Sequence, residues 1–288
     1  MPSTQGKYVI VIRCPERRGI VAAVSGYLAD HQQTIIESSQ FCDASTNTFF
    51  MRVVFGPDCG VCPEIAVLRD SFAPLAEGFA MDWELHDCAA KPRVLIAVSK
   101  FGHCLNDLLH RWRSGLLPIE IPAVISNHED MRSFVEWNEL PFHYLPVAKD
   151  SKAQQEAQIM SLVDELKVDL VVLARYMQIL SPQLCAHLDG RCINIHHSFL
   201  PSFKGARPYH QAYARGVKMI GATAHYVTTD LDEGPIIAQD ARPVDHAFSP
   251  EQLVALGQEV ECAVLGRAVT AQVQHRILRN GAKTVVFA

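Results

Sequence analysis

The stretch RVLIAVSKFGHCLNDLLHRW (93–112) decides the fold class. Its first seven residues are almost continuously apolar, which is typical of a strand buried on both faces of a parallel sheet. Apolar residues then return at helical spacing, at Leu105, Leu108, Leu109 and Trp112, so a helix is expected directly after the strand. A strand that runs straight into a helix is the first half of a βαβ unit.

The same alternation continues downstream. Apolar runs at 119–125, 169–174 and 191–196 predict further strands, and helical spacing around Phe134 and over 159–166 predicts helices between them. Strands that alternate with helices imply a Rossmann-like, mostly parallel sheet. The last elements expected are a short strand near Phe142, strands at 219–229 and 234–244, and a long helix over 250–275.

The first part of the chain has a different rhythm. Phe49, Met51, Val53 and Phe55 recur with a period of two, which predicts a strand with one buried face. Turns and helical spacing around this strand give the order βαββαβ, a ferredoxin-like α+β sandwich. The expected strands are 7–13, 35–41, 47–55 and 79–86. We therefore predict a small domain over 1–88, a linker at 89–92 and an α/β domain over 93–288.

Composition sets limits on partners and location. The 288 residues carry a net charge of −5 and are 49% hydrophobic and 20% charged, so no nucleic-acid partner is expected. No apolar run approaches the roughly 20 residues that span a bilayer, so no membrane partner is expected either. The nine cysteines are odd in number and irregularly spaced, which favours free thiols in a reducing cytoplasm. Cys59 and Cys62 form a lone CxxC without a second ligand pair, so we expect no metal.

One strand end carries an unusual set of polar residues. Alternation along 191–196 places Asn194 and His196 on one face, at the carboxyl end of a parallel strand where open α/β sheets bind ligands. Both side chains can stabilise a carbonyl oxygen that gains negative charge, and histidine can also exchange a proton. The adjacent His197 is expected to point away from His196, so the pair is a poor metal site.

A carboxylate is needed to complete such a site. Asp230, Asp232 and Glu233 crowd one turn, and His225 precedes them on a strand, but spacing alone does not choose among the three acids. The alternative interpretation is a structural histidine beside a solvated acidic turn.

Two longer segments resemble a known family. NIHHSFLPSFKGARPYHQAYARG (194–216) and GATAHYVTTDLDEGPIIAQD (221–240) resemble the folate-dependent formyltransferases, whose motif is Asn-x-His with a later Asp in a His-x6-Asp run. The resemblance implies that Asn194, His196 and Asp232 are catalytic. It implies that they activate water and stabilise a tetrahedral oxyanion, with Asp232 as the base that orders the water and with Asn194 and a protonated His196 on the oxyanion.

The resemblance also implies a substrate. LARYMQILS (173–181) is similar to the segment whose backbone holds the pterin ring, and SKFGHCLNDLL (99–109) is similar to the branch that hydrolyses 10-formyltetrahydrofolate. That branch releases formate for purine biosynthesis and balances one-carbon folate pools. The folate is then a substrate, and no cofactor is expected. The implied substrate contacts are Met177, Gln178, Ile179, Leu180, Gly205, His225 and Thr228.

Transfer of the formyl group to an amine acceptor is the main rival interpretation. The loop 99–103 has one glycine and a bulky phenylalanine, which departs from the glycine-rich loop that would hold a phosphate-bearing acceptor. Water is therefore the expected nucleophile. Two more rival interpretations are a folate sensor without activity and a purely structural α/β protein. His103 and Cys104 have no assigned role.

The N-terminal unit, with CPERRGI (14–20) after its first strand, looks like an ACT domain. The resemblance implies an amino-acid effector, such as glycine or methionine, bound at Arg18, Gly19 and Ile20 near a helix N-terminus. The alternative is a turn that only caps this helix. Edge strands of such a domain favour pairing with another copy, so a homo-oligomer, dimer or tetramer, is expected.

Overall fold

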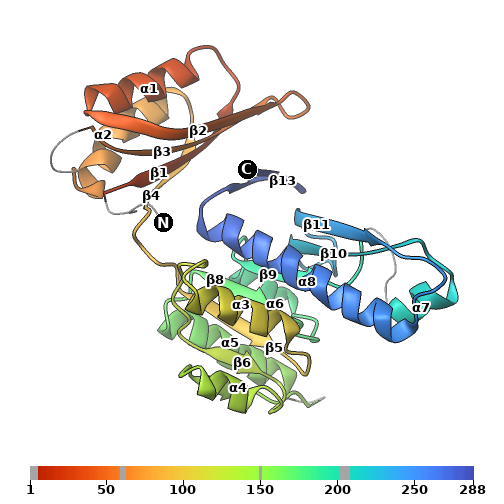
Figure 1. The fold of residues 1–288 in the computed structure, drawn as a ribbon. Coiled ribbons are helices and arrows are strands. Elements are labelled where there is room, and N and C mark those ends of the chain that lie inside the picture. Colours follow the sequence, from red (N-terminus) through yellow and green to blue (C-terminus); the bar gives the residue numbers. More distant parts are fainter. Residues whose placement is uncertain (1–5, 59–62, 149–150, 201–207) are drawn as a thin grey trace. The chain divides into compact units, whose positions relative to one another are not determined.

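The computed structural model describes residues 6–58, 63–148, 151–200 and 208–288. The chain forms two compact units (Figure 1). The first comprises Met1–Lys91 with Gln274–Asn280 and Val285–Ala288, and the second comprises Pro92–Val273 with Gly281–Thr284. The sequence assigned everything after residue 92 to one domain, whereas two C-terminal segments belong to the first unit.

The first unit is an antiparallel sheet with two helices. Its elements are β1 (Tyr8–Pro15), α1 (Ile20–Asp30), β2 (Gln33–Asp43), β3 (Thr48–Pro57), α2 (Ile65–Gly78) and β4 (Asp82–Asp87). The strands lie in the order β2-β3-β1-β4, and every neighbouring pair is antiparallel. This is the predicted βαββαβ arrangement, so the fold class of this part is confirmed.

The central strand β3 is buried on both faces. Its residues Met51 and Val53 pack in one core with Leu28 of α1 and Phe72 of α2, as the period of two predicted. On the other face, Phe50 is buried against a C-terminal hairpin, through Leu278 and Phe287 among others. The hairpin consists of β12 (Ile277–Asn280) and β13 (Lys283–Val286). The alternation pattern predicted one buried face because the covering segment lies more than two hundred residues away in sequence.

The second unit is built on one seven-stranded sheet. Its strands are β5 (Val94–Val98), β6 (Val124–Ser126), β7 (Phe142–Tyr144), β8 (Leu170–Leu173), β9 (Cys192–His196), β10 (Met219–Tyr226) and β11 (Ile236–Pro243). They lie in the order β11-β10-β9-β8-β5-β6-β7 (Figure 1). The five strands from β9 to β7 are parallel, whereas β10 is antiparallel to both of its neighbours. The predicted mostly parallel sheet is therefore confirmed.

Helices cover this sheet. They are α3 (His103–Arg113), α4 (Arg132–Trp137), α5 (Lys152–Glu165), α6 (Pro182–His187), α7 (Pro208–Ala214) and α8 (Pro250–Val273). Helices α5 and α6 contribute to a core with β5 and β8, while α8 packs against β9, β10, β11 and α3. The short helices α6 and α7 were not predicted, since fewer than two turns give little periodic signal. Among the described residues, no helix is long and apolar enough to cross a membrane.

The topology brings polar residues to one edge of the sheet. Strands β8 and β9 are parallel and pair Leu173 with Asn194, so their carboxyl ends lie together. Strand β10 returns antiparallel and pairs His225 with Asn194 and Thr223 with His196. The residues singled out in the sequence therefore meet where a parallel sheet gains an antiparallel neighbour.

Candidate active site

Four polar side chains converge at the end of β9. Asn194 and His196 project from one face of the strand, while Ile193 and Ile195 are buried on the other. The Asn194 Nδ2 atom lies 3.2 Å from Nε2 of His225 on β10. Asp232, in the turn after β10, places one carboxylate oxygen 3.2 Å from Nδ1 of His196 and the other 3.6 Å from Nε2 of His225.

The hydrogen bonds fix the proton positions on both histidines. His225 Nδ1 lies 2.9 Å from the carbonyl oxygen of Tyr226, and a carbonyl can only accept, so Nδ1 carries the proton. The Nε2 atom of His225 faces both the Asn194 amide and the Asp232 carboxylate. On His196, Nδ1 donates to Asp232, and Nε2 is buried and has no hydrogen-bond partner among the described residues. The His196 Nε2 atom is the group in this cluster that is free to exchange a proton.

The electrostatics keep Asp232 ionised. Burial is the largest single influence and opposes ionisation, but hydrogen bonds and charge from His196 and His225 together outweigh it. The pKa of the Asp232 carboxyl is therefore well below its usual range. A carboxylate of such low proton affinity suits orientation of His196 better than acceptance of a proton.

The turn that presents Asp232 depends on two special backbone positions. Asp232 has φ 58°, in the left-handed region that costs a non-glycine residue about 1 kcal/mol or more. Gly234, two residues later, leaves no space for a Cβ, which would collide with the carbonyl of Tyr226. This turn brings Asp232, the acid that the His-x6-Asp motif implied, into contact with both histidines.

A cavity of about 220 Å³ opens beside these residues. Its lining includes the segment implied to hold the pterin ring (Met177, Gln178, Ile179 and Leu180), together with Thr228 and the four polar residues of the site. Met177 and Ile179 are 53% and 60% exposed, as expected of apolar side chains that a flat ligand would cover. Gly205, the remaining implied contact, lies outside the described residues.

Ser99 was not predicted as part of the site, yet it positions this segment. Its hydroxyl accepts a hydrogen bond from the backbone N–H of Met177 at 2.9 Å and donates to Asn127 at 2.7 Å. Ser99 directly follows the strand β5, whose carboxyl edge is where ligands bind in parallel sheets. That position is the sequence signal that could have identified it.

The sequence predicted that His197 points away from His196, and this prediction is wrong. The two rings stack with centroids 4.9 Å apart and an interplanar angle of 22°. The strand β9 ends at His196, so its alternation does not extend to the next residue. Burial first, and then the charges of Arg175 and His196, lower the pKa of His197 to about 4.

The residues expected to bind an effector lie at the start of α1. Gly19 caps this helix with φ 98°, a conformation that glycine adopts without strain, and Arg18 is exposed. The side chain of Ile20 is buried in the core of the first unit, so only its backbone could face a ligand. The seven described cysteines are free thiols, while Cys59 and Cys62 lie outside the described residues.

Comparison with known proteins agrees with this geometry. The Formyl transferase family model matches residues 92–269. Formyltetrahydrofolate deformylase of Corynebacterium sp. (strain P-1) is 52% identical over 286 residues, which cover 99% of each chain. The corresponding Bacillus subtilis (strain 168) protein is 48% identical, over 96% of this chain and 93% of that one.

Solved structures give the same result. The crystal structure of formyltetrahydrofolate deformylase from Burkholderia mallei is similar with a TM-score of 0.93 and 51% identity, over 98% of this chain and 100% of that one. A glycinamide ribonucleotide transformylase from Symbiobacterium toebii matches 69% of this chain and 95% of its own, with a TM-score of 0.65 and 28% identity. The sheet and its polar strand end thus define a formyl transferase domain.

The similarity to the transformylase stops at about two thirds of the chain, whereas the deformylases match it almost from end to end. The chain belongs to the formyltetrahydrofolate deformylase family.

Proposed function

We propose that this protein hydrolyses 10-formyltetrahydrofolate to formate and tetrahydrofolate. The observation that carries the proposal is the contact of Asp232 with both histidines, beside Asn194 and at the wall of a cavity with an apolar rim. The near full-length similarity to deformylases supports the choice of hydrolysis over transfer to an amine. No cofactor is needed, since water and the folate supply every reacting atom.

The reaction begins with the formyl carbonyl between Asn194 and His196. A water molecule attacks the formyl carbon, and His196 Nε2 takes one of its protons while Asp232 holds the proton on Nδ1. The negative charge that develops on the carbonyl oxygen is stabilised by the second N–H of the Asn194 amide and by the imidazolium that forms. This assignment revises the base from Asp232 to His196, because Asp232 already contacts Nδ1 of His196, while Nε2 of the same ring is buried and has no hydrogen-bond partner among the described residues.

Collapse of the tetrahedral intermediate returns the proton. His196 gives it to N10 of the folate, the C–N bond breaks, and tetrahydrofolate leaves with its N10–H restored. The other product is formic acid, which loses its proton to solvent at neutral pH. One water molecule is consumed for each formyl group.

The test is turnover of 10-formyltetrahydrofolate without any acceptor, with formate and tetrahydrofolate both quantified. Asn194→Ala, His196→Ala and Asp232→Asn are each expected to lower kcat by a factor on the order of 10²–10³. Near wild-type kcat in all three variants would show that this cluster is not the catalytic site. A dependence of tetrahydrofolate formation on an added amine would favour transfer instead.

We also propose that the first unit is an ACT-type regulatory domain of a homo-oligomer, dimer or tetramer. Its edge strand β2 exposes Ile35, Ile36 and Phe41, which suits burial against a second copy. Glycine or methionine is the proposed effector, with its carboxylate at the N-terminus of α1. The site of action is the cytoplasm, where formate would serve purine biosynthesis. Sedimentation of wild type and Phe41→Lys, and equilibrium dialysis with both amino acids, test these proposals separately.

A further inference from the structure

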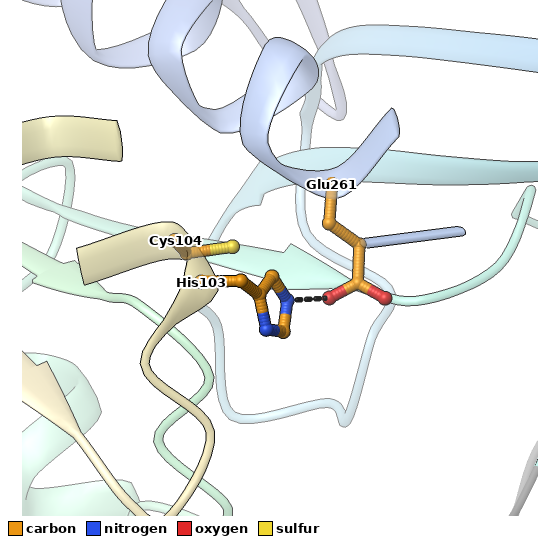
Figure 2. Close-up of side chains that lie close together, drawn as sticks. All are labelled: His103, Cys104 and Glu261. Carbon is orange, nitrogen blue, oxygen red and sulfur yellow. Dashed lines mark hydrogen bonds and ion pairs between the residues drawn. The ribbon is translucent and has the colours of Figure 1, made fainter. Parts of the chain in front are cut away.

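A second buried cluster of charged residues lies next to the catalytic cavity. Figure 2 shows its centre, where His103 at the start of α3 reaches Glu261 of α8. The Glu261 side chain is 1% exposed, and its carboxylate accepts from His103 Nε2 at 2.8 Å and from the hydroxyl of Tyr209 at 2.7 Å. Arg175 Nε lies 3.4 Å from the same carboxylate. Burial opposes ionisation of Glu261, but these partners hold its pKa below the usual value, so the carboxylate is charged.

The cluster has the residue types of a metal site but not the electrostatics of one. Ligand atoms of His103, Cys104 and Glu261 lie within 4.8 Å of one another. A metal ion would have to share Glu261 with the Arg175 cation and displace donors that already satisfy the carboxylate. A hydrogen bond with Cys262, followed by burial, raises the pKa of Cys104 well above its usual value, so the thiol stays protonated. We therefore assign no metal to it.

Arg175 is the member of this cluster whose backbone conformation and burial are unfavourable in free energy. Its backbone has φ 64°, a left-handed conformation that costs a non-glycine residue about 1–3 kcal/mol. Its side chain is 11% exposed, and its buried Nε makes no well-aligned hydrogen bond within the described part of the chain. The backbone carbonyl accepts from the N–H of Ser99, and the guanidinium lies 6.0 Å from the ring centroid of Phe101. A strained and buried arginine that is held from several sides indicates a functional constraint.

The position of Arg175 suggests which function it serves. Arg175 and His197 line the same cavity as Asn194 and His196, and His197 stacks on His196. The pterin segment, 177–180, and the turn residues 227–231 also line this cavity. An enzyme that transfers the formyl group must admit a second substrate next to the formyl carbon, whereas a hydrolase needs room for water alone.

We propose that Arg175, locked in place by Glu261, fills the part of the cavity that an amine acceptor would need and so restricts the nucleophile to water. This makes Arg175 a specificity-determining residue, and the inference rests on the proposed hydrolysis. Glu261 in turn accepts hydrogen bonds from His103 on α3 and Tyr209 on α7, which fix the carboxylate that contacts Arg175. The loop 99–103 thus contributes to acceptor exclusion through His103 and Phe101, which gives a role to a histidine that the sequence left unassigned.

The experiment measures how the formyl group partitions between water and an amine. Wild type, Arg175→Gly and Arg175→Ala are each supplied with 10-formyltetrahydrofolate and a concentrated primary amine, glycinamide. Formate and N-formylglycinamide are quantified together. Since pocket contacts typically discriminate by about 10–200-fold, the ratio of N-formylglycinamide to formate is expected to rise at least tenfold in the variants. The alanine variant keeps the test valid if the glycine variant does not fold.

Lys167→Gly is the matched control. Lys167 also has a left-handed φ of 49°, but it does not line the cavity, so its replacement relieves the same backbone strain without opening the site. It should partition like wild type. The proposal would be overturned if the Arg175 variants gave the same ratio of N-formylglycinamide to formate as wild type. Folded variants that lose both products would overturn it too, since Arg175 would then act in catalysis. Failure of wild type to release formate without an amine would instead refute the proposed function.

Discussion

Replacement of Gly257 by alanine tests whether the buried cluster is as tightly built as the structure indicates. Gly257 lies inside α8, one turn before Glu261, and the ring of Tyr209 occupies the space where a Cβ would be. The collision involves both the ring carbon and the hydroxyl oxygen of Tyr209, so the ring must move. Movement of the ring breaks the hydrogen bond from Tyr209 to Glu261.

The expected cost follows from three opposing contributions. Overpacking in a core typically costs about 1–3 kcal/mol, and loss of a hydrogen bond to a charged group costs about 1.5–3 kcal/mol. Alanine is more favourable than glycine inside a helix by about 1 kcal/mol, which offsets part of this loss. The free energy of unfolding of the second unit should therefore fall by about 1.5–5 kcal/mol.

Urea denaturation, followed by circular dichroism, measures this change. Gly26→Ala is the control, because Gly26 also lies inside a helix but has no atom within 4 Å of the place that a Cβ would occupy, and it should stabilise by about 0.5–1 kcal/mol. With Tyr209→Ala in the background, Gly257→Ala should lose most of its cost, since the obstructing ring is gone. A Gly257→Ala protein as stable as wild type would refute the packing argument.

Further predictions follow from the site and from the first unit. Ser99→Ala removes the acceptor for the Met177 N–H, so KM for 10-formyltetrahydrofolate should rise by about tenfold in steady-state formate assays while kcat changes less. Because the folded pKa of Asp232 is lowered, its contribution to stability is complete above about pH 3.9 and is lost as the pH falls further. In Asp232→Asn, the midpoint of urea denaturation should therefore fall less with decreasing pH than it does in wild type. Burial and the charge of His86 lower the pKa of His275 to about 4, so its contribution is complete above about pH 6.5 and is lost between that value and pH 4. Thermal unfolding at a series of pH values should show that Tm falls less over this pH range in His275→Gln than in wild type.

Local rules were sufficient for the fold class of both units. The change from a continuous apolar run to helical spacing across 93–112 predicted a strand followed by a helix, and the structure has β5 and α3 there. The period of two in β3 predicted which residues face the helices of the first unit. These predictions hold because burial on one face imposes the period directly on the sequence.

The arrangement of the site depended on contacts that no local rule encodes. Alternation along β9 placed Asn194 and His196 on one face, but the position of His225 opposite Asn194 depends on the register of β10. The motif implied Asp232, but its contact with both histidines depends on a turn in which Asp232 is left-handed. Arg175 and Glu261 are far apart in the chain, and nothing in either local sequence distinguishes a buried ion pair from two surface charges. Phe50 was not predicted to be buried, because the hairpin that covers it lies at the far end of the chain.

The central claim is that water, activated by His196 and Asp232, is the nucleophile that removes the formyl group. The most direct test is a reaction of purified protein with 10-formyltetrahydrofolate alone in isotopically labelled water, with mass analysis of the formate. Hydrolysis predicts one solvent oxygen in each formate and one tetrahydrofolate for each formate released. The absence of formate, or the release of tetrahydrofolate only after an amine is added, would contradict it.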